Sequence, residues 1–328
     1  NNLSGSIPST FGKLKNLQWL SVAYNELNGT LPNEIGNLTN LQYLYAPVNQ
    51  LSGVFPRHLG DMKSLQELYL PANRFSGELP AEISKLYNLS IFVIYSNSLS
   101  GSIPAELENC SNLQVLDLSN NFFTGIIPTG LGKLEGLVVL NLSFNFISGN
   151  IHPDLAKCSQ LLHLDLSHNA LTGSIPLELG TLSKLEMLAL SDNQLVDSIP
   201  STLGNLSGLK ELQLGGNQLC GAIPSELSKD INLQIALNLS HNKLNGSIPA
   251  ELGYLTKLEN MHLEGNELSG CIPQSFTSLT SLTVFNISYN DFMGPIPDVL
   301  VFKRIAPSNF LGNKNLCGIP LPYACNPN

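Results

Sequence analysis

An asparagine returns every 24 residues along most of this chain. It stands at Asn25, Asn49, Asn73, Asn97, Asn121, Asn145, Asn169, Asn193, Asn217, Asn242, Asn266 and Asn290, with one step of 25 residues after the ninth. A fixed period of about 20 to 50 residues is typical of solenoids, in which each repeat packs on its neighbours. The period therefore favours one stack of repeats over the two or three domains that 328 residues would otherwise suggest.

Leucines precede each asparagine with a spacing that predicts a short strand. In one repeat these are Leu161, Leu164 and Leu166, and the last two alternate with outward-facing residues. A single turn cannot bury such leucines, so we expect neighbouring strands to lie about 4.8 Å apart in a parallel sheet. Twelve such strands are predicted to line one concave face.

The other recurrent residues predict how the chain turns. The asparagine amide can serve backbone groups that lose their partners where the strand ends. Four residues later a glycine recurs, which suits a turn with positive φ, and only Asp197 departs from this pattern. A proline then follows an isoleucine in most repeats and is expected on the convex side, where its fixed φ leaves the concave ladder intact.

The repeated text resembles the plant extracellular leucine-rich repeat, LxxLxLxxNxLxGxIP, over about residues 1–300. The stretch from Asn309 to Cys325 is similar to the C-terminal cap of plant leucine-rich-repeat receptor kinases. The resemblance implies a leucine-rich-repeat solenoid of the α/β-type repeat class, a curved right-handed superhelix with a parallel β-sheet on its concave face. We expect about twelve 24-residue repeats over residues 1–300, the first one partial, and a cap with a disulfide over 301–328. The family's N-terminal cap is missing, which suggests either a truncated ectodomain or a chain whose beginning is not included in this sequence.

Charge is scarce in this sequence. Only 12% of residues are charged, against about 25% in an average soluble protein. Sixteen Lys and Arg against 25 Asp and Glu leave a net charge of −9, which argues against a nucleic-acid partner. No run of 18 apolar residues occurs, so we expect no membrane span within this stretch. The repeat explains the scarcity, because Leu, Asn, Gly, Pro and Ser fill most of its positions.

Six cysteines are present, and we expect only one disulfide. Cys317 and Cys325 close a short loop in the cap and are predicted to pair. Cys110 and Cys158 hold equivalent positions two repeats apart, roughly 9.6 Å, beyond the ~7 Å limit for a disulfide. Cys220 and Cys271 are also predicted to be unpaired. The chain has neither a CxxC nor an HExxH motif, and we predict no metal site and no cofactor.

Ten N-x-[ST] sequons favour a secreted glycoprotein, although the repeat itself generates about half of them. They start at Asn2, Asn28, Asn37, Asn88, Asn109, Asn141, Asn205, Asn238, Asn245 and Asn286. The residues at 141, 238 and 286 are predicted to be outward strand positions, where glycans would obstruct part of the concave face.

Outward strand positions are free of the packing pattern, so departures there carry functional information. The first four repeats concentrate aromatic residues at these positions, including the only tryptophan. Tyr and Trp commonly anchor interfaces, so we predict ligand binding at Trp19, Tyr43, Tyr45, Tyr69 and Tyr95. The alternative is that these rings only stabilise the sheet as cross-strand neighbours.

Acidic residues gather on the same predicted face. They are Glu26, Glu67, Asp117, Asp165, Asp192, Glu211, Glu264, Glu267 and Asp291, against Arg74 and Lys243. Such a face would attract a basic segment of a partner, and we add Asp117 and Asp165 to the predicted ligand-binding residues. An open sheet offers these carboxylates no water-excluded pocket, so we predict no catalytic residues and no enzyme activity here.

The resemblance implies a function in recognition. The expected protein is the extracellular ligand-recognition domain of a plant receptor kinase or receptor-like protein, at the outer face of the plasma membrane. A peptide or protein ligand would lie on the concave face, and a co-receptor kinase would dock near the C-terminal repeats. A transmembrane segment and a cytoplasmic kinase would then lie outside this stretch. Two alternatives stay open: a secreted inhibitor resembling polygalacturonase-inhibiting proteins, or an oligosaccharide-binding receptor.

Overall fold

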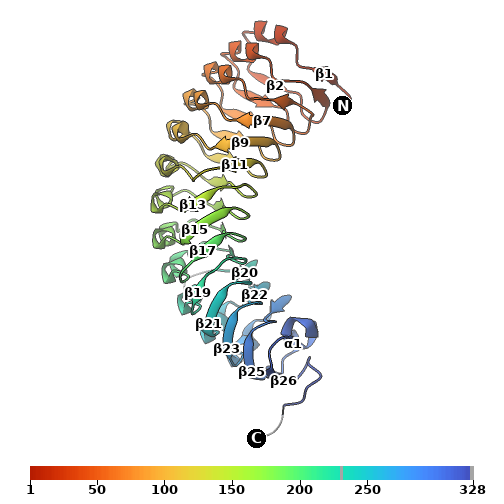
Figure 1. Cartoon of the computed structure of the whole chain (residues 1–328), viewed down its shortest axis with the longest axis vertical. Helices are drawn as coiled ribbons and strands as arrows, with labels where there is room; N and C mark the ends of the chain where they lie inside the picture. The colour runs from red at the N-terminus through yellow and green to blue at the C-terminus, as the bar shows by residue number, and fades with distance from the viewer. Residues whose placement is uncertain (230–231, 326–328) are drawn as a thin grey trace. The chain divides into compact units, whose positions relative to one another are not determined.

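A computed structural model describes residues 1–229 and 232–325. The chain divides into two compact units, unit 1 (Asn1–Ala170) and unit 2 (Leu171–Asn328), and each is built from stacked turns of similar design. In each turn a three-residue strand leads through a tight bend to a flanking strand and then to a one-turn 3₁₀ helix. Within each unit of Figure 1, the 3₁₀ helices lie along one side and the main strands along the other.

The main sheet of unit 1 is parallel and follows chain order. Its strands are β2 (Trp19–Ser21), β4 (Tyr43–Tyr45), β6 (Glu67–Tyr69), β8 (Ile91–Val93), β10 (Val115–Asp117), β12 (Val139–Asn141) and β14 (His163–Asp165). Unit 2 continues the pattern with β16 (Met187–Ala189), β18 (Glu211–Gln213), β20 (Ala236–Asn238), β22 (Asn260–His262) and β24 (Val284–Asn286). The twelve strands predicted from the repeat are therefore confirmed within the described residues.

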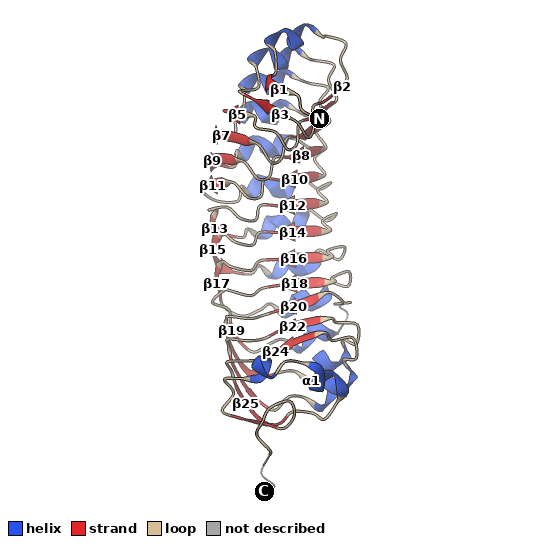
Figure 2. Cartoon of the chain, turned by 90° about the vertical axis from the view of Figure 1, so that its right-hand side faces the viewer, coloured by secondary structure: helices blue, strands red, loops and turns tan. Residues whose placement is uncertain are grey.

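Shorter sheets flank the main strands in both units (Figure 2). In unit 1 they comprise β1 (Ser4–Ser6), β3 (Glu26–Asn28), β5 (Ser52–Gly53), β7 (Arg74–Glu78), β9 (Ser98–Ser102), β11 (Phe122–Thr124) and β13 (Ser148–Asn150). Those that follow are β15 (Ala170–Ser174), β17 (Gln194–Val196), β19 (Cys220–Gly221), β21 (Lys243–Ser247), β23 (Glu267–Gly270), β25 (Asp291–Pro295) and β26 (Asn315–Cys317).

The 3₁₀ helices form the side opposite the main strands, and most begin directly after the recurrent proline, whose fixed φ suits their first turn. In unit 1 they are η1 (Ser9–Lys13), η2 (Asn33–Asn37), η3 (Arg57–Asp61), η4 (Ala81–Lys85), η5 (Ala105–Asn109), η6 (Thr129–Lys133) and η7 (Pro153–Lys157). Unit 2 has η8 (Leu177–Thr181), η9 (Ser201–Asn205), η10 (Ser225–Ser228), η11 (Ala250–Tyr254), η12 (Gln274–Ser278) and η13 (Pro307–Phe310), together with the α-helix α1 (Leu300–Arg304).

Leucine columns form the core. Leu113, Leu116 and Leu118 are fully buried, and strand register places Leu116 beside Leu140 of the next repeat. Burying one such side chain contributes about 1.5–3 kcal/mol, so each turn depends on its neighbours for a core. At the C-terminal end Phe302 and Phe310 are fully buried against the last main strand and replace a further repeat there.

The recurrent asparagines act as predicted. In unit 1 the Nδ2 of Asn73 donates to the carbonyls of Ala46, Leu70 and Pro71, at 2.8 to 3.2 Å. Its Oδ1 accepts from the Leu51 N–H at 3.1 Å. One buried side chain therefore joins two consecutive repeats at the end of the strand.

The turn after the asparagine has the positive φ that its glycine predicts. Gly77 has a φ of 74°, and Asp197, which replaces the glycine in one repeat, keeps a φ of 66°. The backbone is therefore set by the repeat, and Asp197 adopts a conformation that Asp tolerates better than most residues.

The cysteines also follow the prediction. Cys317 and Cys325 form a disulfide with their Cα atoms 5.1 Å apart. The other four cysteines are free; Cys110 and Cys158 are buried, whereas Cys220 and Cys271 are exposed.

Candidate ligand-binding face

The outward side chains of the main strands in unit 1 form two rows, which we call the sheet face. Register places equivalent residues of successive strands side by side. The first row is Trp19, Tyr43, Glu67, Ile91, Val115, Val139 and His163, and the second is Ser21, Tyr45, Tyr69, Val93, Asp117, Asn141 and Asp165. Neither row contains Lys or Arg.

Four of the predicted residues meet in one group of rings, which we call the aromatic cluster: Trp19, Tyr43, Tyr45 and Tyr69. The Trp19 ring centre lies 4.7 Å from that of Tyr43 and 5.1 Å from that of Tyr45. Tyr45 and Tyr69 meet edge to face at 5.9 Å. Trp19 is 56% exposed, whereas the three tyrosines are half-buried against one another. The cluster is therefore a partly packed platform with one open ring.

Hydrogen bonds fix the tyrosines in place. The Tyr45 hydroxyl donates to Glu67, and the Tyr43 hydroxyl donates to Oε1 of Gln66 at 3.3 Å. Burial, followed by the bond to Glu67, raises the pKa of Tyr45 above its ordinary value. Burial, followed by the proximity and hydrogen bond of Tyr95, raises the pKa of Tyr69. Both phenols therefore stay protonated at neutral pH, and Tyr95 extends the cluster by one residue.

The two predicted aspartates lie further along the second row, on β10 and β14, with Asn141 between them. Oδ1 of Asp117 accepts from the N–H and the hydroxyl of Ser119, at 3.0 and 2.6 Å. Burial raises the pKa of Asp117, the bonds from Ser119 oppose this shift, and the charge of Asp165 adds to it. Asp117 is one strand away from Val93 and two from Tyr69, whereas Asp165 stands apart from the cluster.

Glu67 is the acidic residue that sequence reasoning did not assign to the aromatic cluster. Its first-row position beside Tyr43 follows from strand register, but its bond to Tyr45 in the second row depends on side-chain conformation. Two further ring pairs lie at the margin of unit 1: Phe122 with Phe146 at 6.1 Å, and Phe144 with His168 at 4.0 Å. The repeat register alone could have placed these pairs together.

The sheet face combines aromatic and acidic side chains. Exposed ring surface beside carboxylates attracts cationic and amphipathic groups. In the described part of the chain, no three His, Cys, Asp or Glu side chains gather in a way that could hold a metal ion. Nor does any helix there have the length and apolar character needed to cross a bilayer.

The sequons divide by position. Asn141, Asn238 and Asn286 are half-buried outward strand residues. The Oδ1 of each accepts the N–H and hydroxyl of the serine two residues later, at 2.7 to 3.1 Å. The other seven sequon asparagines are exposed.

Comparison with known proteins agrees with this architecture. Two sequence profiles, both described as Leucine rich repeat, match residues 1–51 and 136–195, and residues 64–86, 112–134, 208–229, 235–255 and 257–279. Together they cover more than half of the chain. The chain belongs to the leucine-rich-repeat family.

Its repeats are homologous to those of plant leucine-rich-repeat receptor kinases. One segment of 52 residues is 42% identical to the LRR receptor-like serine/threonine-protein kinase ERECTA of Arabidopsis thaliana. That segment takes up 16% of this chain and 5% of ERECTA. The similarity to curated relatives therefore concerns the repeats and not the whole receptor.

Solved ectodomains match over nearly the whole leucine-rich-repeat chain. The ectodomain of the Arabidopsis thaliana receptor kinase GASSHO1/SCHENGEN3, in complex with CASPARIAN STRIP INTEGRITY FACTOR 2, is 40% identical with a TM-score of 0.90. The Arabidopsis receptor kinase HAESA, in complex with the peptide hormone IDA and the co-receptor SERK1, is 38% identical, also with a TM-score of 0.90. The matches cover 99% and 97% of this chain but only 42% and 52% of those chains.

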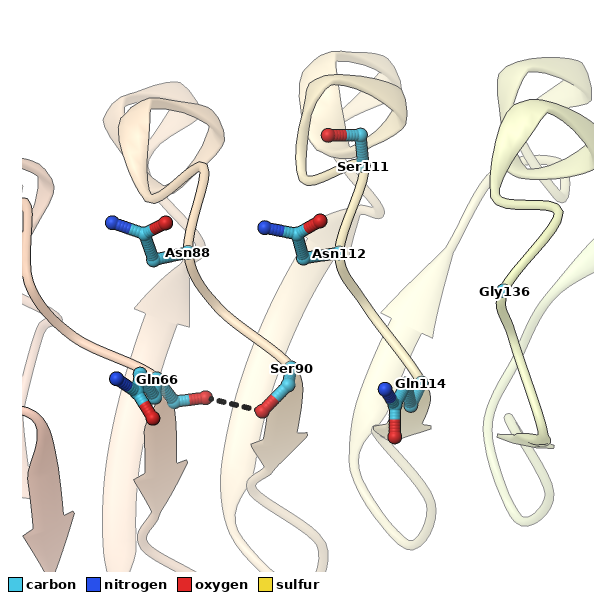
Figure 3. A pocket seen from close by; sticks show the side chains of 7 residues that line it. All are labelled: Gln66, Asn88, Ser90, Ser111, Asn112, Gln114 and Gly136. Atoms are coloured by element: carbon cyan, nitrogen blue, oxygen red, sulfur yellow. Dashed lines mark hydrogen bonds between the residues drawn. The ribbon is translucent and has the colours of Figure 1, made fainter.

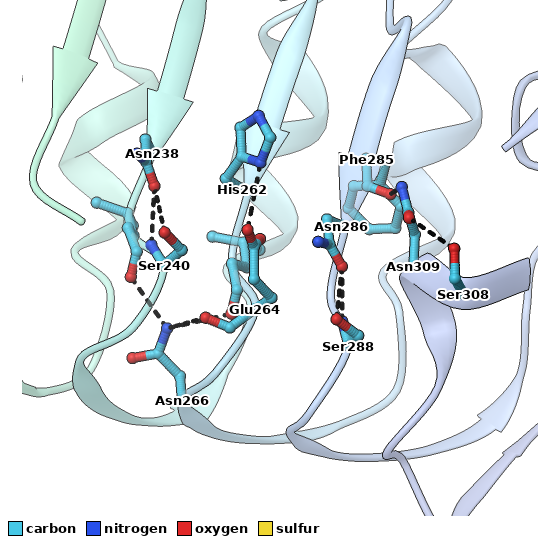
Figure 4. A network of polar contacts seen from close by, with 12 residues as sticks. Asn238, Ser240, His262, Glu264, Asn266, Phe285, Asn286, Ser288, Ser308 and Asn309 are labelled. Atoms are coloured by element: carbon cyan, nitrogen blue, oxygen red, sulfur yellow. Dashed lines mark hydrogen bonds and ion pairs between the residues drawn. The ribbon is translucent and has the colours of Figure 1, made fainter. Parts of the chain in front are cut away.

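The leucine-rich repeats of unit 2 present a different, polar face (Figure 4). His262 Nδ1 lies 3.4 Å from Oε1 of Glu264, while Oε2 of Glu264 is buried without a hydrogen-bond partner. Burial by itself raises the pKa of Glu264, but the bond from His262, a backbone N–H and the charges of His262 and His241 together lower it. The serine-bonded Asn238 and Asn286 lie on either side of this pair.

Proposed function

We propose that this chain is the ligand-recognition region of a plant leucine-rich-repeat receptor kinase. It binds a peptide or protein ligand on the sheet face of unit 1, outside the plasma membrane. A co-receptor docks near the C-terminal repeats, and the membrane anchor and kinase belong to parts of the protein outside this sequence. The two matched ectodomains support this proposal, because both are in complex with a ligand and HAESA is also in complex with a co-receptor.

The observation that carries the proposal is the aromatic cluster with its open Trp19 ring. Aromatic residues contribute much of the free energy at interfaces, because they bury a large rigid surface at low entropic cost. Here three tyrosines and Glu67 hold the platform before any ligand arrives. A ligand ring or aliphatic chain that covers Trp19 therefore meets a preorganised surface.

The charge of the sheet face favours a basic ligand. Glu67 lies within the cluster, Asp117 lies two strands beyond Tyr69, and neither row of the sheet face contains Lys or Arg. A ligand segment with Lys or Arg next to an apolar residue would satisfy both features at once. Such charges also speed the encounter between partners, and salt weakens this effect.

Substitution of Trp19 tests the proposal. Trp19→Ala removes the open ring while leaving the Tyr45 to Glu67 bond in place. Tyr254→Ala is the matched control, because Tyr254 is 73% exposed on η11 and lies outside the sheet face. Peptides captured from plant extracellular fluid by the wild-type chain are identified by mass spectrometry, synthesised and titrated calorimetrically against all three proteins.

We expect Trp19→Ala to weaken binding at least about 30-fold, as truncation of an anchor residue does. Tyr254→Ala should bind like the wild type. Equal affinity of the Trp19→Ala variant and the wild type would remove the aromatic cluster from the ligand site.

A further inference from the structure

A cavity of about 430 Å³ opens at the side of the sheet in unit 1. Figure 3 shows its side chains between the 3₁₀ helices and the strands. The lining residues come from four consecutive repeats: Gln66, Asn88, Ser90, Ser111, Asn112, Gln114 and Gly136. This volume lies within the range of about 300–1,000 Å³ that small-molecule sites occupy.

Two departures from the repeat create the cavity. The residue before the main strand is Gln in the first three repeats and again at Gln114, but it is Ser90 in the fourth. Two residues earlier, Asn88 and Asn112 are followed in the next repeat by Gly136, which has no side chain. The space is left empty because Ser90 is shorter than the Gln found at this position in neighbouring repeats, and because Gly136 has no side chain where the two preceding repeats have Asn.

The lining is uncharged and polar. Side-chain amides and hydroxyls supply both donors and acceptors, and none of the lining side chains is apolar or ionisable. Within the residues that the structure describes, the side chains of Ser111, Asn112 and Gln114 make no hydrogen bond. Gln66 accepts from Tyr43, so the cavity borders the aromatic cluster.

We propose that this cavity binds a neutral sugar. Sugar hydroxyls donate and accept at once, as the amides of Asn112 and Gln114 do. The cavity has no apolar side chain to pack against a hydrophobic peptide side chain, and without Lys or Arg it offers no charged partner to a phosphate or carboxylate.

The sugar can come from two sources. One is a free oligosaccharide. The other is a glycan attached to Asn88. The sequon of this asparagine ends at Ser90, and both Asn88 and Ser90 line the cavity. In that case Asn88 Nδ2 forms a bond to the anomeric carbon of a lipid-pyrophosphate-linked oligosaccharide, loses a proton and releases the lipid pyrophosphate.

Two substitutions of Ser90 separate filling of the cavity from loss of the sequon. Ser90→Ala and Ser90→Gln both remove the sequon and the bond from Ser90 Oγ to the Gln66 carbonyl, but only Gln fills the space. Gly136→Asn fills it from the other column and leaves the sequon intact. The nearest atom to a Cβ at Gly136 is 3.9 Å away, so the fold accommodates this change.

A matched control comes from unit 2. Thr283 comes directly before its main strand, as Ser90 does, and its hydroxyl likewise donates to a backbone carbonyl, that of Glu259 at 3.1 Å. Thr283→Gln, introduced into the Ser90→Ala protein, repeats the chemical change outside the cavity. Circular dichroism and melting temperature confirm folding of each variant.

The neutral probes are cellotetraose and xylotetraose, and tetragalacturonate is the charged comparison. Binding of each probe is measured by saturation-transfer NMR and calorimetry. We expect Ser90→Ala to bind a neutral probe, with or without Thr283→Gln, and Ser90→Gln to bind it at least about tenfold more weakly. If wild-type protein from glycosylating cells binds like Ser90→Ala, the occupant is a free sugar and Gly136→Asn weakens binding. If the Ser90→Ala protein binds a neutral probe but the glycosylated wild type does not, the Asn88 glycan occupies the cavity.

Failure of Ser90→Ala to bind any neutral probe would overturn the proposal, as would equal binding by Ser90→Gln or preference for tetragalacturonate. The measurement does not involve the peptide ligand. Its outcome is therefore independent of the function proposed for the aromatic cluster.

Discussion

A single asparagine per repeat does much of the work of joining one turn to the next. Asn73 is only 9% exposed and makes four hydrogen bonds with backbone groups of its own repeat and the preceding one. Those backbone groups have no strand partner where the chain bends. Because a buried polar group without a partner is costly, the asparagine cannot be replaced by a leucine of similar size without loss.

Asn73→Ala should lower the free energy of unfolding by roughly 2–4 kcal/mol, since each buried group left unpaired costs about 1–3 kcal/mol. Asn40→Ala is the control: Asn40 is exposed and makes one bond, to the Lys15 carbonyl at 2.9 Å. Its loss should cost less than about 1 kcal/mol. Urea denaturation of both variants measures the difference, and equal midpoints would contradict the role assigned to Asn73.

Glu264 predicts a pH dependence in unit 2. Its folded-state pKa lies below the ordinary value of 4.5, so the stability that it contributes is present above about pH 4.5. That contribution is lost as the pH falls through the lowered pKa. Glu264→Gln should therefore melt at a lower temperature than the wild type at pH 6, and the gap should close toward pH 3. A gap that stays constant over this range would show that the His262 to Glu264 pair does not stabilise the fold.

Side-chain detail at the candidate site lay beyond what the sequence could predict. Strand register follows from the repeat and correctly places Tyr43, Tyr45 and Tyr69 on one face. It does not specify that Tyr45 turns toward Glu67 or that the three tyrosines are half-buried. Those features depend on how neighbouring rings pack, which no single repeat determines.

At the scale of elements, the sequence predicts the main strands but not the flanking strands or the 3₁₀ helices. The alternation of leucines indicates each main strand, because period 2 is a strand signal. Flanking strands such as β9 (Ser98–Ser102) carry no such alternation, since Ser and Gly make up most of their residues. The 3₁₀ helices are too short for a helical period, and only the proline at their start marks them.

Close packing of successive 3₁₀ helices leads to a prediction about glycine. A Cβ at Gly60 of η3 would lie 2.3 Å from the carbonyl oxygen of Glu82 in η4. Gly60→Ala should therefore destabilise unit 1 by about 1–3 kcal/mol, because the two turns must separate. Gly136→Ala has ordinary space around it and should change stability by less than about 1 kcal/mol. Thermal melts that rank the two variants in the opposite order would contradict this account of helix spacing.

At the scale of the whole chain, the repeat explains both the low charge and the placement of chemistry. Leu, Asn, Gly, Pro and Ser occupy most of the positions that build each turn. Charged residues, the tyrosines and the tryptophan are therefore confined largely to positions that point outward, whereas most phenylalanines are buried in the core. Free cysteines follow the same rule. Cys110 and Cys158 replace the leucine that follows a 3₁₀ helix and are buried, whereas Cys220 and Cys271 lie on the exposed flank.

Thiol reactivity should report this division. Burial raises the pKa of Cys110 and of Cys158 to about 11, so neither forms the reactive thiolate at pH 8 in the folded chain. Brief alkylation of native protein should label Cys220 and Cys271, with Cys110 and Cys158 reacting only in urea. Peptide mass spectrometry identifies the labelled sites, and Cys220→Ser with Cys271→Ser provides the control, which should show no rapid labelling. Rapid native labelling of Cys110 or Cys158 would mean that the leucine columns of unit 1 open far more readily than their complete burial implies.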